Sequence, residues 1–387
     1  MTQTTVTPET VRPLFEIGDD VVYMNCAAQG PAPKAAAAAG RRAVDRKARP
    51  WEPERDNLAA EMTRARELFA GFIGASAADI ALSTATSYAV ATAANSLTLE
   101  AGQTVVVLEG QFPSNLYAWQ ILAERSGASM VVVPRPANGD WTGAVLEHLG
   151  PQTGLVALPN VHWVDGGVLD LGPIADATHA QGAALFIDAT QSIGVLPLDI
   201  ARLDPDYVAC SAYKWLLSPD QCGYLYVAPR RQHGMPVEHN HAGRVGDGPM
   251  TLSPGYGSRF QPGARRFDQG AADSMIHVPM AVAAMEQIRD WGLAAIANGI
   301  APVIDRIADE AQTRGWWVPP KAHRSPHFIG LAMPQPPTPD LAERLAAENV
   351  HVSLRSGRVR VAPYLFTRME EVDVLFRALD RAVRSAA

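Results

Sequence analysis

The sequence contains few cysteines and no excess of basic charge. Its 387 residues include three cysteines, at positions 26, 210 and 222, too few and too irregularly spaced for a disulfide framework or a zinc site. His239 and His241 lie two residues apart without a cysteine or a regularly spaced third ligand nearby, so we expect no metal. The formal net charge is −7 at pH 7, and we therefore expect neither a nucleic-acid partner nor binding to an anionic membrane.

Long hydrophobic runs are also absent. No stretch approaches the roughly 20 apolar residues of a membrane-spanning helix, and the first 20 residues lack a basic segment followed by an apolar core. We therefore expect a cytoplasmic protein. No G-x-G-x-x-G or G-x-x-x-x-G-K-[ST] motif follows an early strand-like run, which argues against a nucleotide-binding α/β protein. Hydrophobic residues at 47% and charged residues at 19% are typical of a globular chain large enough for more than one domain.

The most informative stretch is DYVACSAYKWLLSPDQCGYLYV, residues 206–227. Its two ends predict strands, because they are short, rich in β-branched or aromatic residues and bounded by turn residues. Lys214 lies just after the first strand, between Tyr213 and Trp215. Aromatic neighbours partly desolvate an amine, which disfavours its charged form and leaves a nucleophile suited to a Schiff base. A surface lysine that follows a strand is the alternative interpretation.

A carboxylate ends the preceding strand-like run. Asp188 follows apolar residues in AALFIDATQSIG, and a carboxylate at the carboxyl end of a buried parallel strand points into the crevice where α/β sheets bind ligands. Pyridoxal phosphate requires an amine that binds its aldehyde and an anion that keeps its pyridine nitrogen protonated. The pair Asp188 and Lys214 therefore favours this cofactor.

The pattern D-x-x-Q at residues 188–191, followed by S-x-[HY]-K at residues 211–214, resembles the class V aminotransferase family of fold-type I pyridoxal-phosphate enzymes. That group also contains cysteine desulfurases, kynureninases and isopenicillin N epimerase-like proteins. The resemblance extends from about Tyr23 to the C-terminus. It implies pyridoxal 5'-phosphate as the cofactor and a homodimer with shared active sites.

The resemblance also implies a domain organisation. We expect an N-terminal arm over residues 1–20 and a large cofactor-binding α/β domain over residues 21–270, with a mainly parallel sheet and helices on both faces. Residues 271–387 predict a smaller α+β domain, because helices and strands follow there in a pattern different from the preceding alternation.

Several positions match residues that hold the cofactor in the family. Lys214 would form the Schiff base, Asp188 would face the pyridine nitrogen, and Gln191 would donate to the phenolic oxygen. The ring of Phe112 would stack on the cofactor, with core packing as the alternative. Three hydroxyl residues, two at the start of a predicted helix and one before the lysine, would hold the phosphate: Thr86, Ser87 and Ser211. Ordinary N-capping is the alternative for the first two.

Other positions match the substrate side of the family's site. Arg360, in RVRVAPYLFT, corresponds to the arginine that forks onto the substrate α-carboxylate. A surface charge is the alternative for Arg360 and for Arg358, which shares its strand face. Asn25 lies in the opening segment that reaches the substrate, with a plain loop as the alternative.

Two further residues are candidates for proton transfer or hydrogen bonding. Tyr213 would be a proton donor or a phosphate ligand, with a packed aromatic residue as the alternative. His162 would bond the phenolic oxygen or the substrate carboxylate, although a lone loop histidine is more often only solvated. The family usually has asparagine or threonine at that position and a small polar residue after it. Trp163 therefore indicates a bulkier pocket.

The segment between residues 229 and 267 is a long loop rich in Gly, Pro, His and Arg, and such loops in compact domains are usually functional. In the family it covers an active site, often that of the neighbouring subunit. Shortly after it, Ala271 replaces a threonine that contacts the partner's phosphate in the family. Ser274 is a candidate substitute for the missing hydroxyl.

The resemblance leaves the reaction open among three outcomes for a small amino acid. Desulfurases carry a mobile cysteine shortly before the carboxylate-binding arginine, and AENVHVSLRSGRVRV has none. Phe112 and Tyr213 favour the kynureninase-like and epimerase-like branches. We therefore expect side-chain lyase chemistry, with transamination or epimerisation as the alternatives. A non-catalytic protein of the same fold is the alternative from another class, although it would not need the lysine and the acid.

Overall fold

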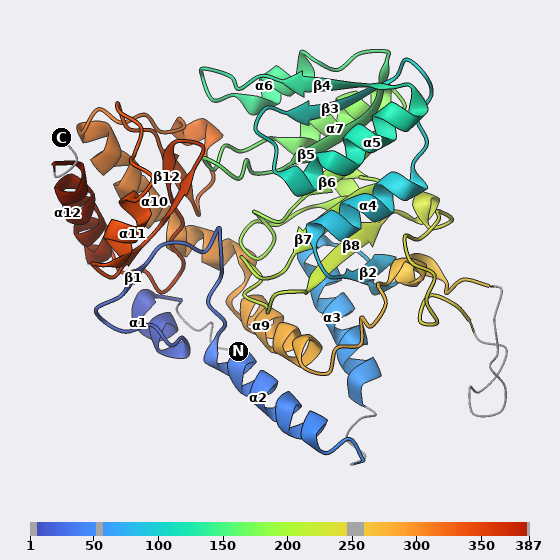
Figure 1. Ribbon diagram of the computed structural model, residues 1–387, viewed down its shortest axis with the longest axis horizontal. Coiled ribbons are helices and arrows are strands. Elements are labelled where there is room, and N and C mark those ends of the chain that lie inside the picture. The colour runs from blue at the N-terminus through green and yellow to red at the C-terminus, as the bar shows by residue number, and fades with distance from the viewer. Residues whose placement is uncertain (1–5, 52–56, 246–258, 385–387) are drawn as a thin grey trace.

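The computed structural model describes residues 6–51, 57–245 and 259–384. Part of the long polar loop, residues 246–258, therefore lies outside the described residues, and its predicted role above an active site stays a prediction. A seven-stranded sheet forms the centre of the larger part of the molecule (Figure 1). Its strands are β2 (Ile80–Ser83), β3 (Thr104–Leu108), β4 (Ser129–Val133), β5 (Thr153–Pro159), β6 (Ala184–Asp188), β7 (Tyr207–Ser211) and β8 (Gly223–Val227).

The strand order is β2-β8-β7-β6-β5-β3-β4. All neighbours from β7 to β4 are parallel, whereas β8 runs antiparallel to both β7 and β2. Every residue of β5, β6 and β7 is buried, as expected for parallel strands that are covered on both faces and composed mainly of apolar residues. The expectation of a mainly parallel sheet is confirmed.

Helices cover both faces of this sheet. One apolar cluster joins it to α4 (Thr86–Ser96) and α5 (Tyr117–Ser126). The cluster on the other face includes residues of α3 (Leu58–Ile73) and α7 (Leu171–Ala180). Alternate residues of each strand enter opposite clusters, as the period of two along a strand requires. Two shorter helices complete this part, α6 (Trp141–Leu146) and α8 (Ile200–Leu203).

The C-terminal part has α+β composition. Its strands β9 (Ile329–Leu331), β11 (Ser353–Arg355) and β12 (Arg358–Val361) form an antiparallel sheet in the order β11-β12-β9. The accompanying helices are α9 (His277–Trp291), α10 (Leu293–Thr313), α11 (Leu341–Ala346) and α12 (Glu370–Arg384). Helix α9 packs against α2 (Lys34–Ala48) and α3, so it joins the two parts (Figure 1). A domain boundary near residue 270 stays a prediction.

The N-terminal segment is tied to the C-terminal part. After the short helix α1 (Pro8–Val11), strand β1 (Val22–Tyr23) pairs in parallel with β10 (Val350–His351). The buried guanidinium of Arg12 forms a 2.7 Å ion pair with Glu371 and donates to three backbone carbonyls. The opening segment therefore contributes to the fold before it reaches the site.

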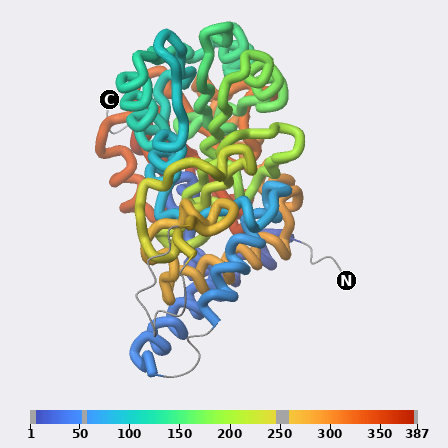
Figure 2. The backbone as a smooth tube through the Cα atoms, turned by 90° about the vertical axis from the view of Figure 1, so that its right-hand side faces the viewer, coloured from blue at the N-terminus to red at the C-terminus, as the bar shows by residue number. Residues whose placement is uncertain are grey.

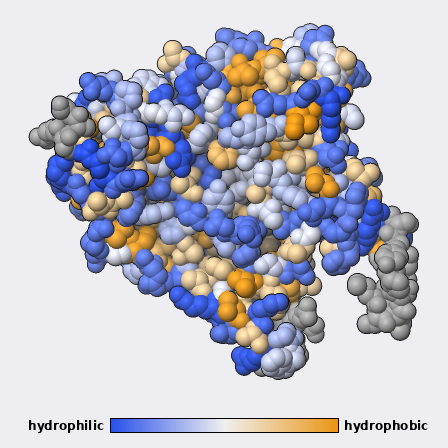
Figure 3. Space-filling model, in the orientation of Figure 1, coloured by the Kyte–Doolittle hydropathy of each residue, from blue (hydrophilic) through white to orange (hydrophobic). Residues whose placement is uncertain are grey.

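Figure 2 shows α2 and α3 at the lower end of the molecule, close to α9. On the face in Figure 3, hydrophilic side chains are interspersed with small apolar patches. Within the described residues, no helix has the length and apolar character that a membrane crossing needs. The cytoplasmic location stays a prediction.

Candidate active site

The residues of the candidate site gather where β5, β6 and β7 end. A cavity of about 190 Å³ opens at this edge of the sheet. Many of the residues predicted from the sequence line it: Thr86, Phe112, Asp188, Gln191, Ser211, Tyr213 and Lys214. Parallel strands bring their carboxyl ends to one edge, so side chains far apart in the chain meet in one crevice.

Lys214 lies in the turn after β7 and is 6% exposed. Its Nζ is 5.3 Å from the ring centroid of Phe112 and 5.4 Å from that of Tyr213. Burial lowers the pKa of Lys214 to about 8, with Asp188 opposing and Arg360 reinforcing the change. About a tenth of this amine is therefore unprotonated at pH 7, far more than for an ordinary lysine, and able to attack a carbonyl carbon.

Close backbone packing holds the lysine turn in place. A Cβ added at Gly30 would lie 1.9 Å from the carbonyl oxygen of Lys214, and one at Gly194, where φ is +107°, would lie 2.2 Å from that of Trp215. The amide of Gly30 also donates to the carbonyl of Tyr213 at 2.9 Å. Side chains at these two glycines would displace the turn, so both positions require glycine.

Asp188 is the last residue of β6 and pairs in register with Ala209 of β7. Its Oδ1 accepts a 3.0 Å hydrogen bond from the amide of Thr190. Burial raises the pKa of Asp188, while Thr190 and Lys214 oppose that rise. A buried carboxylate with so little compensation favours a cation beside it, such as a protonated ring nitrogen.

Three hydroxyl groups meet at the start of α4. Thr86 Oγ1 lies 2.7 Å from Thr190 Oγ1 and 2.8 Å from Ser211 Oγ, and the amide of Thr86 donates to Ser211 Oγ at 2.9 Å. The N-cap residue is Ala85, whose side chain cannot accept a hydrogen bond from the first amides of the helix. Hydroxyls and free amides at a helix N-terminus form a site suited to an anion.

Two aromatic residues form one wall of the cavity. The rings of Phe112 and Trp163 meet edge to face at a centroid distance of 5.2 Å. The indole N–H of Trp163 donates to the carbonyl of Gly110 at 2.7 Å, which fixes the orientation of the indole. The wall thus offers a flat aromatic surface beside Lys214 and excludes water from it.

Gln191 also lines the cavity, and both ends of its side-chain amide form hydrogen bonds. Its Oε1 accepts from the indole N–H of Trp215 at 2.8 Å, and its Nε2 donates to the carbonyl of Ala27 at 3.0 Å. The carbonyl of Gln191 accepts from Nε2 of the buried His327 at 2.7 Å. An amide nitrogen carries two protons, so one N–H of Gln191 is left for a ligand.

Arg360, on β12, is 1% exposed and lies close to this site. Its Nη1 donates to the carbonyl of Trp163 at 2.8 Å and its Nε to Ser353 Oγ at 3.2 Å. Burial and the neighbouring Arg355 lower the pKa of Arg360 to about 9. No carboxylate of the described residues lies within 4.0 Å of it, so this guanidinium is suited to bind an external carboxylate.

A sequence model of the class V aminotransferases matches residues 44–378. The chain belongs to the class V aminotransferase family. Proteins of this family are pyridoxal-phosphate enzymes, and this chain is a pyridoxal-phosphate-dependent enzyme of the lyase or aminotransferase type.

Individual relatives of this class V protein differ in activity. It is 27% identical over 380 residues to isopenicillin N epimerase of Streptomyces clavuligerus. The aligned residues cover 93% of this chain and 94% of the relative. It is 31% identical over 225 residues to a probable cysteine desulfurase of Vibrio cholerae, covering 57% of this chain and 54% of the relative.

Solved structures of cysteine desulfurases share the fold. The apo enzyme of Thermococcus onnurineus superimposes with a TM-score of 0.86 at 19% identity, covering 98% of each chain. The Escherichia coli enzyme superimposes with a TM-score of 0.85 at 21% identity, covering 97% of this chain and 98% of that one. The predicted fold-type I architecture is thereby confirmed.

The residues of the class V chain fit the chemical groups of pyridoxal phosphate. Lys214 supplies a buried amine of lowered pKa, and Asp188 a buried carboxylate with few partners. The start of α4 supplies converging hydroxyls beside a helix N-terminus whose N-cap residue is alanine. Asn160, just after β5, has a buried side-chain oxygen without a hydrogen-bond partner among the described residues. An aldehyde, a pyridine nitrogen and a phosphate match the first three of these groups.

The structure does not bring His162 into the cavity, so the expectation that it contacts the cofactor or the substrate is corrected. Its buried ring stacks on Trp141 at 5.0 Å, and its Nδ1 lies 3.4 Å from Asp165 Oδ1. Asp165 also pairs with Arg135. The loop turns between positions 162 and 163, so Trp163 faces the cavity and His162 the interior.

Three other predicted residues do not line the cavity: Ser87, Asn25 and Arg360. Ser87, the second residue of α4, is exposed. The side-chain oxygen of Asn25 is buried without a partner among the described residues. A backbone bridge to Ala362 holds Asn25 near the strand that carries Arg360.

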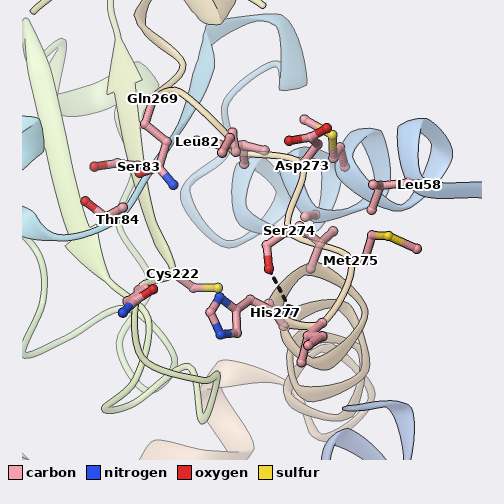
Figure 4. A pocket seen from close by; sticks show the side chains of 18 of the residues that line it. Leu58, Leu82, Ser83, Thr84, Cys222, Gln269, Asp273, Ser274, Met275 and His277 are labelled. Atoms are coloured by element: carbon pink, nitrogen blue, oxygen red, sulfur yellow. Dashed lines mark hydrogen bonds between the residues drawn. The ribbon is translucent and has the colours of Figure 1, made fainter. Parts of the chain in front are cut away.

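A larger cavity, of about 810 Å³, lies between β2 and β8 on one side and α3 and α9 on the other (Figure 4). It contains neither Lys214 nor Asp188, so it is not the catalytic cavity despite its size. Ala271 and Ser274 line it. Ser274 Oγ accepts a 3.2 Å hydrogen bond from the amide of His277 at the start of α9, and its contact with the partner's phosphate stays a prediction.

The sequence analysis missed Thr190 and Asn160. Thr190 lies in the motif DATQ between two residues that were identified, so its position was a usable signal. Asn160 follows β5 in the same way that Asp188 ends β6. Polar residues at the ends of adjacent parallel strands are the common feature.

Proposed function

We propose that this class V enzyme acts on the side chain of a small free amino acid as a lyase, with Lys214 as the residue that carries the cofactor and moves the α-proton. The observation that carries the proposal is the proximity of two unusual cations, a buried lysine of lowered pKa and a buried arginine without a carboxylate partner among the described residues. When bound, pyridoxal phosphate supplies an electron sink for the bonds of the substrate α-carbon.

The residues of the chain have separate tasks in this proposal. Thr86, Thr190 and Ser211 bind the phosphate, and Asp188 binds the protonated ring nitrogen. Phe112 would offer its ring to the cofactor and, with Trp163, would exclude water. Gln191 donates its remaining N–H to the phenolic oxygen.

Arg360 positions the substrate in this proposal. Its guanidinium binds the α-carboxylate while the bond to the Trp163 carbonyl fixes its direction. Trp163 lines the cavity that contains Lys214, so a carboxylate held by Arg360 beside the Trp163 carbonyl would place the substrate α-carbon toward the amine. Holding both groups in one geometry removes much of the entropic barrier of a bimolecular step.

Tyr213 is the proposed proton donor to a leaving group. It lines the cavity beside Lys214, and burial raises the pKa of Tyr213, with Arg360 and Arg355 opposing. The phenol therefore keeps its proton at neutral pH and can deliver it to a departing side chain.

The cysteines support a reaction without a persulfide. Cys26 and Cys210 are buried and burial raises the pKa of both thiols, so neither forms the reactive thiolate readily. Cys222 lines the larger cavity, and burial raises its pKa to about 12. None of the three cysteines, all of which the structure describes, lines the cavity that contains Lys214.

Epimerisation is the second candidate. This candidate is supported by the similarity to isopenicillin N epimerase, which extends over 93% of this chain. The similarity to the probable desulfurase of Vibrio cholerae extends over 57% of it. Tyr213 would then return a proton to the α-carbon instead of giving it to a leaving group.

We also propose a homodimer with shared active sites, as in the family. Sedimentation should then give about twice the 41.4 kDa mass of one chain, and a monomeric holoenzyme with full activity would contradict the proposal.

Product analysis with a panel of amino acids tests the reaction. The loaded protein is mixed with each amino acid without an oxo-acid acceptor, in deuterated water. Lyase action predicts release of the side-chain fragment, while epimerisation predicts inverted substrate with deuterium at the α-carbon. A stable change of the visible absorbance band to the near-ultraviolet, without turnover, would instead indicate transamination. Unchanged spectra and substrates throughout would support the non-catalytic alternative.

A further inference from the structure

Three arginines lie on one face of the hairpin formed by β11 and β12. Arg360 is opposite Ser353, and Arg358 is opposite Arg355. Residues directly opposite in an antiparallel pair, and residues two apart along a strand, point to the same side. Arg355, Arg358 and Arg360 therefore share the side on which Arg360 bonds the carbonyl of Trp163.

None of these three arginines forms an ion pair within 4.0 Å in the part of the chain that the structure describes. Buried arginines elsewhere are paired, as Arg66 is with Asp268 at 2.7 Å. A desolvated guanidinium without a counter-ion is unfavourable. A face with three cations and no acid is therefore suited to an anionic ligand.

Arg358 and Arg355 differ in what they contact. The guanidinium of Arg358 lies 5.0 Å from the ring centroid of Trp317, a favourable position for a cation. Arg355 is half-buried, and its Nη1 donates to the carbonyl of the adjacent Leu354 at 2.7 Å. Its charge reaches the site, because Arg355 contributes to the lowered pKa of both Lys214 and Arg360.

We propose that Arg355 binds a second carboxylate of the substrate, so that the enzyme takes amino acids with an acidic side chain. This rests on the proposed function, in which Arg360 holds the α-carboxylate. Arg355 and Arg360 are diagonal neighbours across the hairpin, and such positions lie roughly 7–8 Å apart. Their long side chains can converge on two carboxylates separated by a short carbon chain.

The electrostatics favour this substrate class over a neutral one. A neutral side chain would leave Arg355 close to Arg360 and Lys214 with the repulsion uncompensated. Asp188 is the one acidic residue among the described residues that line the cavity, and in the proposed function it binds the cofactor. A second carboxylate on the substrate balances Arg355 and forms charge-assisted hydrogen bonds with it.

Binding of unreactive analogues to the loaded enzyme tests the inference. Calorimetry compares glutarate with butyrate, which differ in one carboxylate, and succinate and adipate vary the spacing. The wild type should bind glutarate about tenfold to a hundredfold more tightly than butyrate, as one charge-assisted contact provides. Arg355→Gln should remove that preference and leave butyrate affinity unchanged, and Arg355→Lys should keep part of it.

Arg358→Gln is the matched control, since it removes a charge from the same hairpin face but leaves Arg355 in place. It should retain the glutarate preference. Equal binding of the two acids by the wild type, or a preference that survives in Arg355→Gln, would overturn the inference. The kcat/KM ratio for glutamate over glutamine should follow the same pattern among these variants.

The proposed function fails in a distinguishable way. If the wild type did not take up pyridoxal phosphate, or if Arg360→Gln bound butyrate as tightly as the wild type, the α-carboxylate site itself would be wrong. Uptake of the cofactor with tight butyrate binding and no glutarate preference would overturn the role of Arg355 alone.

Discussion

Removal of the Lys214 amine should make the apoprotein more stable at neutral pH. The substitution Lys214→Met keeps an unbranched chain of similar length in a buried position and removes its charge. Burial lowers the pKa of Lys214 from 10.5 to about 8, and each pKa unit corresponds to about 1.4 kcal/mol of differential interaction, so the charged form is disfavoured by about 3 kcal/mol in the folded state.

The sign of the pH dependence follows from the order of the two pKa values. Because the folded pKa is below the unfolded value, the unfolded chain binds more protons between about pH 8 and pH 10.5, and stability rises with pH in that window. Above pH 10.5 Lys214 is neutral in both states and costs the folded state nothing. As the pH falls to 8 and below, the full cost of burying the charged amine lowers the free energy of unfolding. The stability difference between Lys214→Met and wild type should therefore be largest at pH 7.

Urea denaturation of the apoproteins at pH 7 and pH 10.5 measures this effect. The free energy of unfolding of the variant minus that of wild type should decrease by about 3 kcal/mol from pH 7 to pH 10.5. The decrease is smaller to the extent that Asp188 loses a favourable partner in the variant. Lys321→Met is the control, since Lys321 is exposed and pairs with Asp305 on the surface. A difference that does not change with pH would refute the argument that Lys214 is desolvated.

Three further predictions concern cofactor binding and stability. Thr86→Val should weaken pyridoxal-phosphate binding about tenfold to a hundredfold, measured by fluorescence titration, because it removes a hydroxyl from the cluster at α4. Arg66→Met should lower the free energy of unfolding by about 3–5 kcal/mol in urea, because it leaves Asp268 buried and unpaired. Burial lowers the pKa of His327 from 6.5 to about 4, so the unfolded chain takes up a proton that the folded one does not. The free energy of unfolding of wild type should therefore fall between pH 6.5 and about 4, and that of His327→Gln should fall less.

Each of these has a control or a contradicting result. Ser87→Ala should leave cofactor affinity close to wild type, since Ser87 is exposed outside the cavity. Arg202→Met should change stability by no more than about 1 kcal/mol, because its pair with Asp176 is exposed. A cost for Arg66→Met as small as that for Arg202→Met, or acid unfolding identical in His327→Gln and wild type, would contradict the packing arguments.

The sequence was sufficient for the parts of the site that lie directly on buried strands. Asp188 ends an apolar run and Lys214 follows one, so their position at one sheet edge follows from the rule for parallel strands. Ser211 ends β7 and Phe112 lies in the loop after β3, and both also line the cavity. The apolar pattern locates each strand, and the rule that parallel strands end at one edge of a sheet places the residues at their ends together.

The loop residues were harder to place. His162 and Trp163 are adjacent, and only the turn of the loop decides which side chain faces the cavity. The antiparallel direction of β8 between β2 and β7 is likewise a long-range feature. Arg355 became visible as a candidate only after its strand was paired with the strand of Arg360. The orientation of the loop, the direction of β8 and the pairing of the hairpin depend on contacts between distant segments, which the periodicity of residues along the sequence does not reveal.

The most direct measurement is borohydride reduction of the pyridoxal-phosphate-loaded protein, followed by digestion and mass spectrometry. The account predicts that the pyridoxyl label lies on the peptide containing Lys214 and that Lys214→Ala loses both the label and the visible absorbance band. A label on an exposed lysine such as Lys321, or an unchanged absorbance band in Lys214→Ala, would contradict the central assignment.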